Sequence, residues 1–196
     1  MGFTGVVMAI HTLAVLVENS PGVLARVASL FSRRGYNIDS LAVGPTENPK
    51  VSRMTIVLNL EGHALDQVSA QLFKLVNVIG ISEMKDVDSL KREILLVKVA
   101  NKPATKEIAK KHNVSIADET DSTISIEAVG SSTAIEALLT ELKPHGIREL
   151  VQSGLVAIER GANTLADRTL STMGTANESE SNSSTCLLYT SDAADE

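Results

Sequence analysis

The sequence predicts an α+β protein made of two ferredoxin-like βαββαβ domains. Three observations point to this fold. Apolar and polar residues alternate within short segments, as in β-strands, and segments with an amphipathic helical pattern lie between them. The same order of elements occurs twice in 196 residues. A chain of this length accommodates two small domains, each with a modest core. We therefore predict one domain over residues 10–88, a second over 92–160 and a tail over 161–196.

The first domain is expected to begin with a strand over residues 11–18, followed by a helix that ends at Gly35. The apolar stripe of this helix contains Val23, Leu24, Val27, Leu30 and Phe31. Strands are predicted over 38–43 and 51–60, the latter with Met54, Ile56, Leu58 and Leu60 on one face. A second helix has the stripe Leu65, Val68, Leu72, Leu75 and Val76, and a last strand covers 79–87.

The second domain repeats this order. A strand over 93–99 leads to a short helix over 103–112, and the segments 114–117 and 123–129 form a hairpin. A helix over 133–142 follows, with Ile135, Leu138, Leu139 and Leu142 facing inward. The segments 147–151 and 155–159 are expected to close the sheet. The repeat is visible in single residues, because Asn19-Ser20-Pro21 recurs as Asn101-Lys102-Pro103 after the first strand.

Charge is unevenly distributed, and the tail is the acidic part. Residues 161–196 contain six acids and one base, which account for −5 of the formal net charge of −6. The nearly neutral body has no Lys/Arg cluster, so we expect neither nucleic acid nor a membrane surface as a partner. The polar tail is expected to be disordered. Its end, residues 186–196 (CLLYTSDAADE), resembles a translated sequencing adaptor, and we interpret it as a sequence artefact.

The cellular compartment is predicted from the cysteine content and the first residues. Cys186, in the tail, is the one cysteine, so no disulfide framework is expected and a reducing compartment fits. Residues 1–17 lack charged side chains, which raises the alternative of a signal peptide or a membrane segment. They have no basic start, however, and end in strand-like alternation. We therefore expect a cytoplasmic protein.

No catalytic constellation is found in the sequence. It contains no GxGxxG, GxxxxGK, HExxH or GxSxG motif. The four histidines are far apart in the sequence: His11, His63, His112 and His145. Positions at the surface or at the edge of an element are a simpler interpretation than metal ligation. We predict no catalytic residue and no metal site on this chain.

The turn after the first strand has the composition of a carboxylate-binding site. A helix N-terminus presents free backbone N–H groups, and Pro21 is expected to open its first turn. Gly22 lets a ligand approach the backbone, and Asn19 offers both a donor and an acceptor, as a free α-amino acid requires. A helix that is simply capped remains the alternative, because Asn, Ser and Pro are also favoured at helix starts for structural reasons.

The chain resembles the acetolactate synthase (acetohydroxyacid synthase) small regulatory subunit family, which begins with an ACT domain. The resemblance extends over residues 10 to about 161. In the first domain it is carried by NSPGVL (19–24), RRGYNIDSLAVGPTE (33–47), SRMTIV (52–57) and KLVNVIGI (74–81). In the second domain it is carried by REILLVKV (92–99) and HGIRELVQSGLVAIERG (145–161).

The resemblance implies a regulatory role, with catalysis on another chain. The expected partner is a large subunit that carries thiamine diphosphate, Mg²⁺ and FAD and condenses pyruvate with pyruvate or 2-oxobutyrate. This chain would activate it and convey feedback inhibition by valine or a related branched-chain amino acid. The family pattern further implies a homodimer through the ACT domain, with the effector bound between the chains. The effector residues carried over are Asn19, Pro21, Gly22, Val23 and Leu24 of one chain with Asn37 and Ile38 of the other.

Two departures limit what the resemblance implies. Ala104 stands in the second repeat where Gly22 stands in the first, so no second effector site is predicted. The helix over 103–112 has Ile108 as its one large apolar residue and is shorter than the family pattern. A stand-alone ACT amino-acid sensor, or a regulatory module of another biosynthetic enzyme, remains the alternative function.

Overall fold

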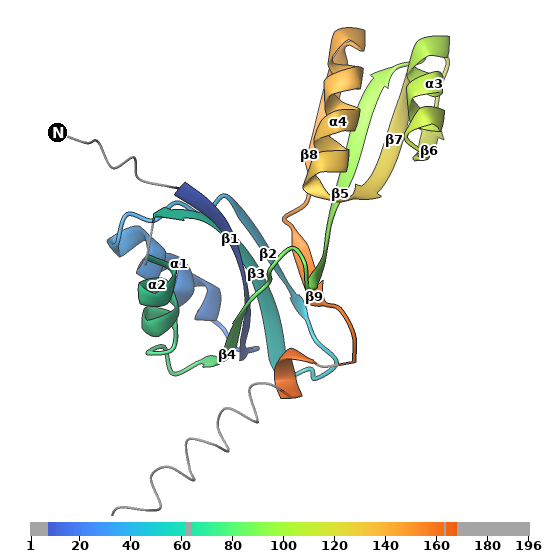
Figure 1. Ribbon diagram of the computed structural model, residues 1–196. Helices are drawn as coiled ribbons and strands as arrows, with labels where there is room; N and C mark the ends of the chain where they lie inside the picture. Colours follow the sequence, from blue (N-terminus) through green and yellow to red (C-terminus); the bar gives the residue numbers. More distant parts are fainter. Residues whose placement is uncertain (1–7, 62–63, 163, 168–196) are drawn as a thin grey trace, which may run out of the picture.

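The computed structural model describes residues 8–61, 64–162 and 164–167, and it shows two βαββαβ domains (Figure 1). The first domain consists of β1 (Met8–Glu18), α1 (Val23–Arg33), β2 (Ser40–Pro45), β3 (Val51–Glu61), α2 (Ala64–Leu72) and β4 (Val78–Glu83). The second consists of β5 (Ser89–Ala100), α3 (Pro103–Lys111), β6 (Ser115–Glu119), β7 (Thr123–Gly130), α4 (Ser132–Leu142), the short 3₁₀ helix η1 (Lys143–His145) and β8 (Ile147–Gln152). The strand β9 (Val156–Glu159) follows. The predicted fold class is confirmed.

The two sheets are built alike. The strand order is β2-β3-β1-β4 in the first and β6-β7-β5-β8 in the second, and every pair is antiparallel. The register also shifts at matching places, between Leu16 and Val17 of β1 and between Lys98 and Val99 of β5. Each shift lies just before the turn that leads into the following helix. The repeat seen in the sequence is therefore a repeat of backbone geometry.

The core of the first domain lies between its sheet and the helices α1 and α2, which cover one face (Figure 1). Leu13, Val15 and Val17 of β1 alternate toward this core, as predicted. Two residues of the predicted stripes differ: Leu24 is 44% exposed and Val76 is 85% exposed. Leu24 lies at the edge of the stripe in the first turn of α1, and Val76 follows the end of α2 at Leu72.

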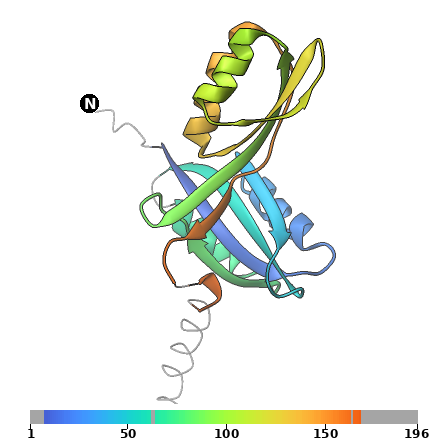
Figure 2. The same ribbon diagram turned by 90° about the vertical axis from the view of Figure 1, so that its right-hand side faces the viewer.

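The strand β9 does not close the second sheet as expected. It pairs with Ser89–Arg92, the first third of β5, and this part of β5 lies against the first domain (Figure 2). A second apolar cluster covers that outer face of the first sheet, with the buried residues Ala14, Leu16, Met84, Leu155, Ala157 and Leu165. Because β1 is covered on both faces, its central residues are buried without interruption. The long strand β5 thus belongs to both domains.

The start of the predicted disordered tail is ordered where the structure describes it. Leu165 is 5% exposed within the outer cluster, and the Thr164 hydroxyl donates to the Asp167 carboxylate at 2.6 Å. This hydrogen bond lowers the pKa of Asp167. Residues 164–167, within the segment for which we predict a disordered tail, thus contact the first domain through Leu165. The predictions for residues 168–196, including the artefact at 186–196, lie outside the described residues.

We expect two truncations to differ in stability. A chain ending at residue 160 loses Leu165, and exposing the apolar surface that it covers should lower the free energy of unfolding by about 2 kcal/mol. A chain ending at residue 185 retains that contact and should unfold like the full chain. Urea denaturation followed by circular dichroism measures both. Equal midpoints for the full chain and the chain ending at 160 would contradict the role given to Leu165.

Candidate functional site

The turn between β1 and α1, residues 19–22, places a glycine at the start of the helix. Gly22 is the N-cap of α1 with φ of 83°, a left-handed conformation, and no side chain caps the helix. A Cβ atom added to Gly22 would meet nothing within 4 Å. The helix therefore begins without a side-chain cap on its first N–H groups, and uncapped N–H groups at a helix start suit an anion. Pro21 precedes the helix instead of opening its first turn, because helical dihedral angles begin only after Gly22.

Asn19 is fixed by the start of β3. Its backbone N–H donates to the Lys50 carbonyl at 2.7 Å, and its side-chain Nδ2 donates to the Pro49 carbonyl at 3.0 Å. One of the two N–H donors of the amide that we expected to serve a ligand carboxylate is thus already used within the chain. The Asn19 Oδ1 remains an acceptor, which is the group that an ammonium needs.

The side chains of the other predicted site residues differ in how far they are exposed to solvent. Val23 is 4% exposed and packs in the core, so its side chain is not available to a ligand. Leu24 presents its side chain to solvent beside the same N–H groups. Asn37 is exposed and donates to the Asp39 carboxylate at 2.6 Å, while Ile38 is half-buried against the first core.

One chain does not bring all seven predicted residues together. Glu18, just before the turn, lies opposite Val51 of β3, whereas Ser40, just after Asn37 and Ile38, lies opposite Val57. Six residues of an extended strand span about 20 Å. Within one chain, the two groups thus lie apart along the sheet.

Two residues beside the turn were not predicted from the sequence. Arg26 Nη1 donates to Asn77 Oδ1 at 2.8 Å, and Asn77 Nδ2 donates to Glu18 Oε2 at 2.6 Å. Arg26 thus lies close to the helix N-terminus, where its positive charge favours an anion. The contact between Arg26 and Asn77 could not be predicted, because the two residues are 51 positions apart in the chain. The helical pattern places Arg26 only on the polar face of α1.

The matching turn of the second domain is closed. Its helix α3 begins already at Pro103, with Lys102 in an extended conformation at the N-cap. The Thr105 hydroxyl accepts from the Lys102 backbone N–H at 3.2 Å and donates to the Ala100 carbonyl at 2.8 Å. Ala104 is therefore an ordinary residue of the first helical turn. The arrangement at Gly22 has no counterpart here.

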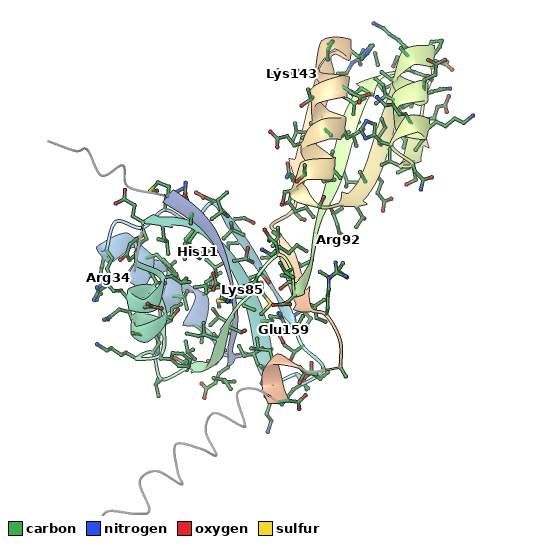
Figure 3. All side chains as sticks on the ribbon, viewed as in Figure 1. His11, Arg34, Lys85, Arg92, Lys143 and Glu159 are labelled. Atoms are coloured by element: carbon green, nitrogen blue, oxygen red, sulfur yellow. The ribbon has the colours of Figure 1, made fainter. Side chains whose placement is uncertain are left out.

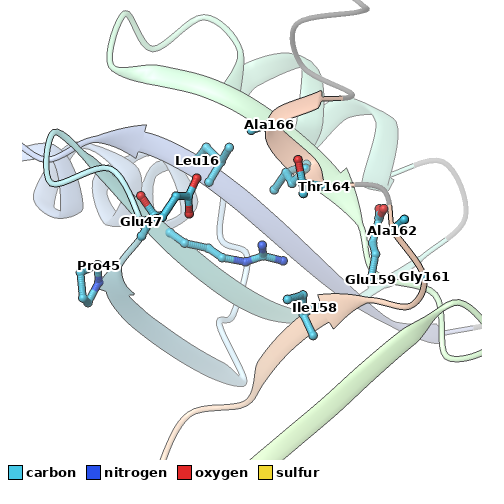
Figure 4. A pocket seen from close by; sticks show the side chains of 12 residues that line it. Leu16, Pro45, Glu47, Ile158, Glu159, Gly161, Ala162, Thr164 and Ala166 are labelled. Carbon is cyan, nitrogen blue, oxygen red and sulfur yellow. The ribbon is translucent and has the colours of Figure 1, made fainter.

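A cavity of about 460 Å³ lies on the other side of the first domain, between β9 and the loop after β2; Glu47 and Glu159 are on its walls (Figure 4). Arg53 Nη2 crosses it to donate to the Ala157 carbonyl at 2.7 Å. Burial lowers the pKa of Arg53, and the carboxylates of Glu159 and Glu47 oppose that shift. Arg53 therefore holds β9 on the sheet. Glu159 lies on this face, whereas Arg34 lies on the helical side (Figure 3).

The described part of the chain shows neither a metal-binding cluster nor a membrane-spanning helix. Within 8–61, 64–162 and 164–167, no group of three or more His, Cys, Asp or Glu side chains is placed to hold a metal ion. Among the helices of these residues, none combines the length and apolar character needed to cross a membrane.

Comparison with known proteins gives one consistent result. Residues 13–80 match the model of the AHAS small subunit-like ACT domain, and residues 92–161 match the model of the small subunit of acetolactate synthase. The acetolactate synthase small subunit of Mycolicibacterium smegmatis is 50% identical over 155 residues, covering 77% of this chain and 91% of that protein. That of Mycobacterium leprae is also 50% identical over 155 residues and is covered to 92%.

A solved structure agrees with the sequence comparison. The crystal structure of the acetolactate synthase small subunit from Thermotoga maritima matches with a TM-score of 0.74 and 31% identity, over 79% of this chain and 99% of that one. The resemblance found in the motifs is thereby confirmed over both domains. The chain belongs to the family of acetolactate synthase small subunits, a regulatory family, and its first domain is an ACT domain.

Proposed function

We propose that this chain activates the catalytic large subunit of acetolactate synthase and conveys feedback inhibition by valine or a related branched-chain amino acid. The observation that carries the effector part is the uncapped N-terminus of α1 at the left-handed Gly22. Membership of the small-subunit family supports the partner. Thiamine diphosphate, Mg²⁺ and FAD are proposed to lie on that large subunit, and the assembly is proposed to be cytoplasmic.

The turn offers each group that an aliphatic amino acid needs. The carboxylate accepts from the N–H groups of Val23 and Leu24, and hydrogen bonds to a charged group contribute about 1.5–3 kcal/mol each. The ammonium donates to Asn19 Oδ1. The branched side chain rests on Leu24, which one chain leaves 44% exposed.

The second half of the site is proposed to come from a second copy of the chain. Asn37 and Ile38 lie about 20 Å from the turn along the sheet of their own chain, as strand spacing gives. In a homodimer of paired ACT domains, the Asn37 and Ile38 of one chain approach the turn of the other. Asn37 then contacts the polar end of the effector, and Ile38 completes the apolar wall.

Arg26→Ala is expected to weaken valine binding up to roughly fivefold, since an exposed pair of opposite charges contributes at most about 1 kcal/mol. Isothermal titration of valine measures this. Arg33→Ala, at the far end of the same helix, is the matched control and should bind like the unchanged chain. Equal losses in both variants would mean that the effect of Arg26 is not local to the turn.

Reconstitution tests the regulatory function. The isolated chain should form no acetolactate, and adding it to a cognate large subunit should raise turnover several-fold. Co-elution of the two chains in size-exclusion chromatography shows whether they associate. Valine binding without association or activation would favour the alternative of a stand-alone amino-acid sensor. Acetolactate formation by the isolated chain would contradict the absence of catalysis.

A further inference from the structure

The two domains meet at the first residues of β2. The Leu155 backbone N–H donates to the Ser40 hydroxyl at 2.9 Å. A Cβ atom on Gly154 would lie 2.6 Å from the Leu41 carbonyl carbon and 2.9 Å from the Ala42 nitrogen, closer than real side chains come. The backbone at Gly154 thus packs directly on the backbone of β2. We call these contacts, between residues 40–42 and 154–155, the junction.

On the first-domain side, the junction continues directly from the proposed effector residues. Asn37 and Ile38 are separated from Ser40 by Asp39 alone. Asp39 is itself held, because its N–H donates to the Val57 carbonyl at 2.9 Å and its carboxylate accepts from Asn37 Nδ2 at 2.6 Å. β2 is an edge strand of this sheet, so it pairs with β3 on one side and has no strand of the sheet on the other. A shift at Asn37 therefore reaches Ser40 through the backbone.

On the second-domain side, the junction is fastened to the sheet and to a helix. The Ser153 N–H donates to the Ile94 carbonyl, and the Ile94 N–H donates to the Ser153 hydroxyl, both at 2.9 Å. One residue earlier, Gln152 Nε2 donates to the Glu93 carboxylate, which also accepts from the Ser132 hydroxyl at the start of α4. Glu93 is buried, so these hydrogen bonds are shielded from water. Gln152 and Ser153 are therefore fastened to β5 and, through Glu93, to the start of α4, directly before the residues that contact β2.

We propose that the junction couples effector binding to the second domain: when the effector orders Asn37 and Ile38, β2 shifts against Gly154 and Leu155 and reorients the second domain. This inference rests on the proposed effector site. It assigns a role to two residues that contact no effector, Ser40 and Gly154, and acts through one continuous path of backbone and hydrogen bonds. Packed backbones transmit a small displacement because they have no space in which to absorb it.

Gly154→Ala tests the coupling, because the added methyl group forces the two backbones apart. In the reconstituted complex, this variant should activate the large subunit to within twofold of the unchanged chain and bind valine with unchanged affinity. Inhibition by saturating valine should be lost. Ser40→Ala, which removes one hydrogen bond, should weaken the inhibition partly. Gly44→Ala is the matched control in the same strand, since a Cβ there meets nothing within 4 Å.

The outcomes separate this inference from the proposed function. Unchanged valine inhibition in both Gly154→Ala and Ser40→Ala would overturn the coupling and leave the effector site intact. If Gly154→Ala does not fold, Ser40→Ala decides alone. If the unchanged chain neither binds valine nor confers inhibition, the proposed function itself fails. Loss of inhibition in Gly44→Ala to the same extent would also overturn the coupling, because any change in β2 would then suffice.

Discussion

Gly22→Asp is expected to abolish valine binding and feedback while leaving activation of the large subunit in place. An effector that half-saturates at about 0.1 mM binds with about 5.5 kcal/mol, so losing two charge-assisted hydrogen bonds of about 1.5–3 kcal/mol each removes much of the total. The aspartate places a Cβ in the open space above the helix N-terminus and a negative charge where the effector carboxylate lies. Steric and Coulomb effects both oppose binding. Isothermal titration of valine should therefore show no heat of binding.

The φ of 83° at Gly22 makes a control essential. A side chain in the left-handed region costs about 1–2 kcal/mol, although Asn and Asp tolerate it better than other residues. Gly22→Asn has the same shape and the same backbone strain but no charge, so it should retain more valine affinity than Gly22→Asp. Equal melting temperatures of the two variants would show that the backbone strain is matched. Unchanged valine affinity in Gly22→Asp would place the effector site elsewhere.

Mixing two variants that each impair the effector site is expected to restore valine binding with the original affinity. Asn37→Leu removes a polar partner of the effector, which costs about 1–3 kcal/mol and so weakens binding roughly 5- to 150-fold. A dimer of one Gly22→Asp chain and one Asn37→Leu chain has one site with both changes and one site with neither. In a symmetric dimer, equal amounts of the two chains should recover about a quarter of the original sites.

The control for this experiment is a mixture in which both chains carry Gly22→Asp, where no site is intact. Titration of the mixed sample should show the original affinity at reduced stoichiometry. A site formed within a single chain would gain nothing from mixing. That result would contradict the proposal that Asn37 and Ile38 act on the turn of the partner.

The elements of both domains could be predicted because each has one face on a core. The alternation of Leu13, Val15 and Val17 and the stripe of Val23, Val27 and Phe31 follow directly from that geometry. The position of β9 could not be predicted, because the pattern of its four residues is compatible with pairing in either sheet. Leu165 was also missed, since a single apolar residue in a polar segment gives no periodic signal.

The residue types of the candidate site could be predicted from the sequence, whereas its hydrogen bonds could be predicted only in part. The residue types at 19–24 indicated a helix N-terminus open to an amino acid, and the left-handed Gly22 agrees with that. The use of the Asn19 amide donor by Pro49 depends on where β3 begins, which local sequence does not encode. The approach of Arg26 and Asn77 likewise depends on the packing of α1 beside the start of β4.

The most direct test of the central claim is acetolactate formation by a cognate large subunit, measured across a range of valine concentrations with and without this chain. We expect the chain to raise turnover several-fold without valine and valine to remove this gain. The turnover of the large subunit alone should not change with valine. A complex whose activity exceeds that of the large subunit but is unaffected by millimolar valine would contradict the effector site. A large subunit whose activity does not change when the chain is added would contradict the regulatory function.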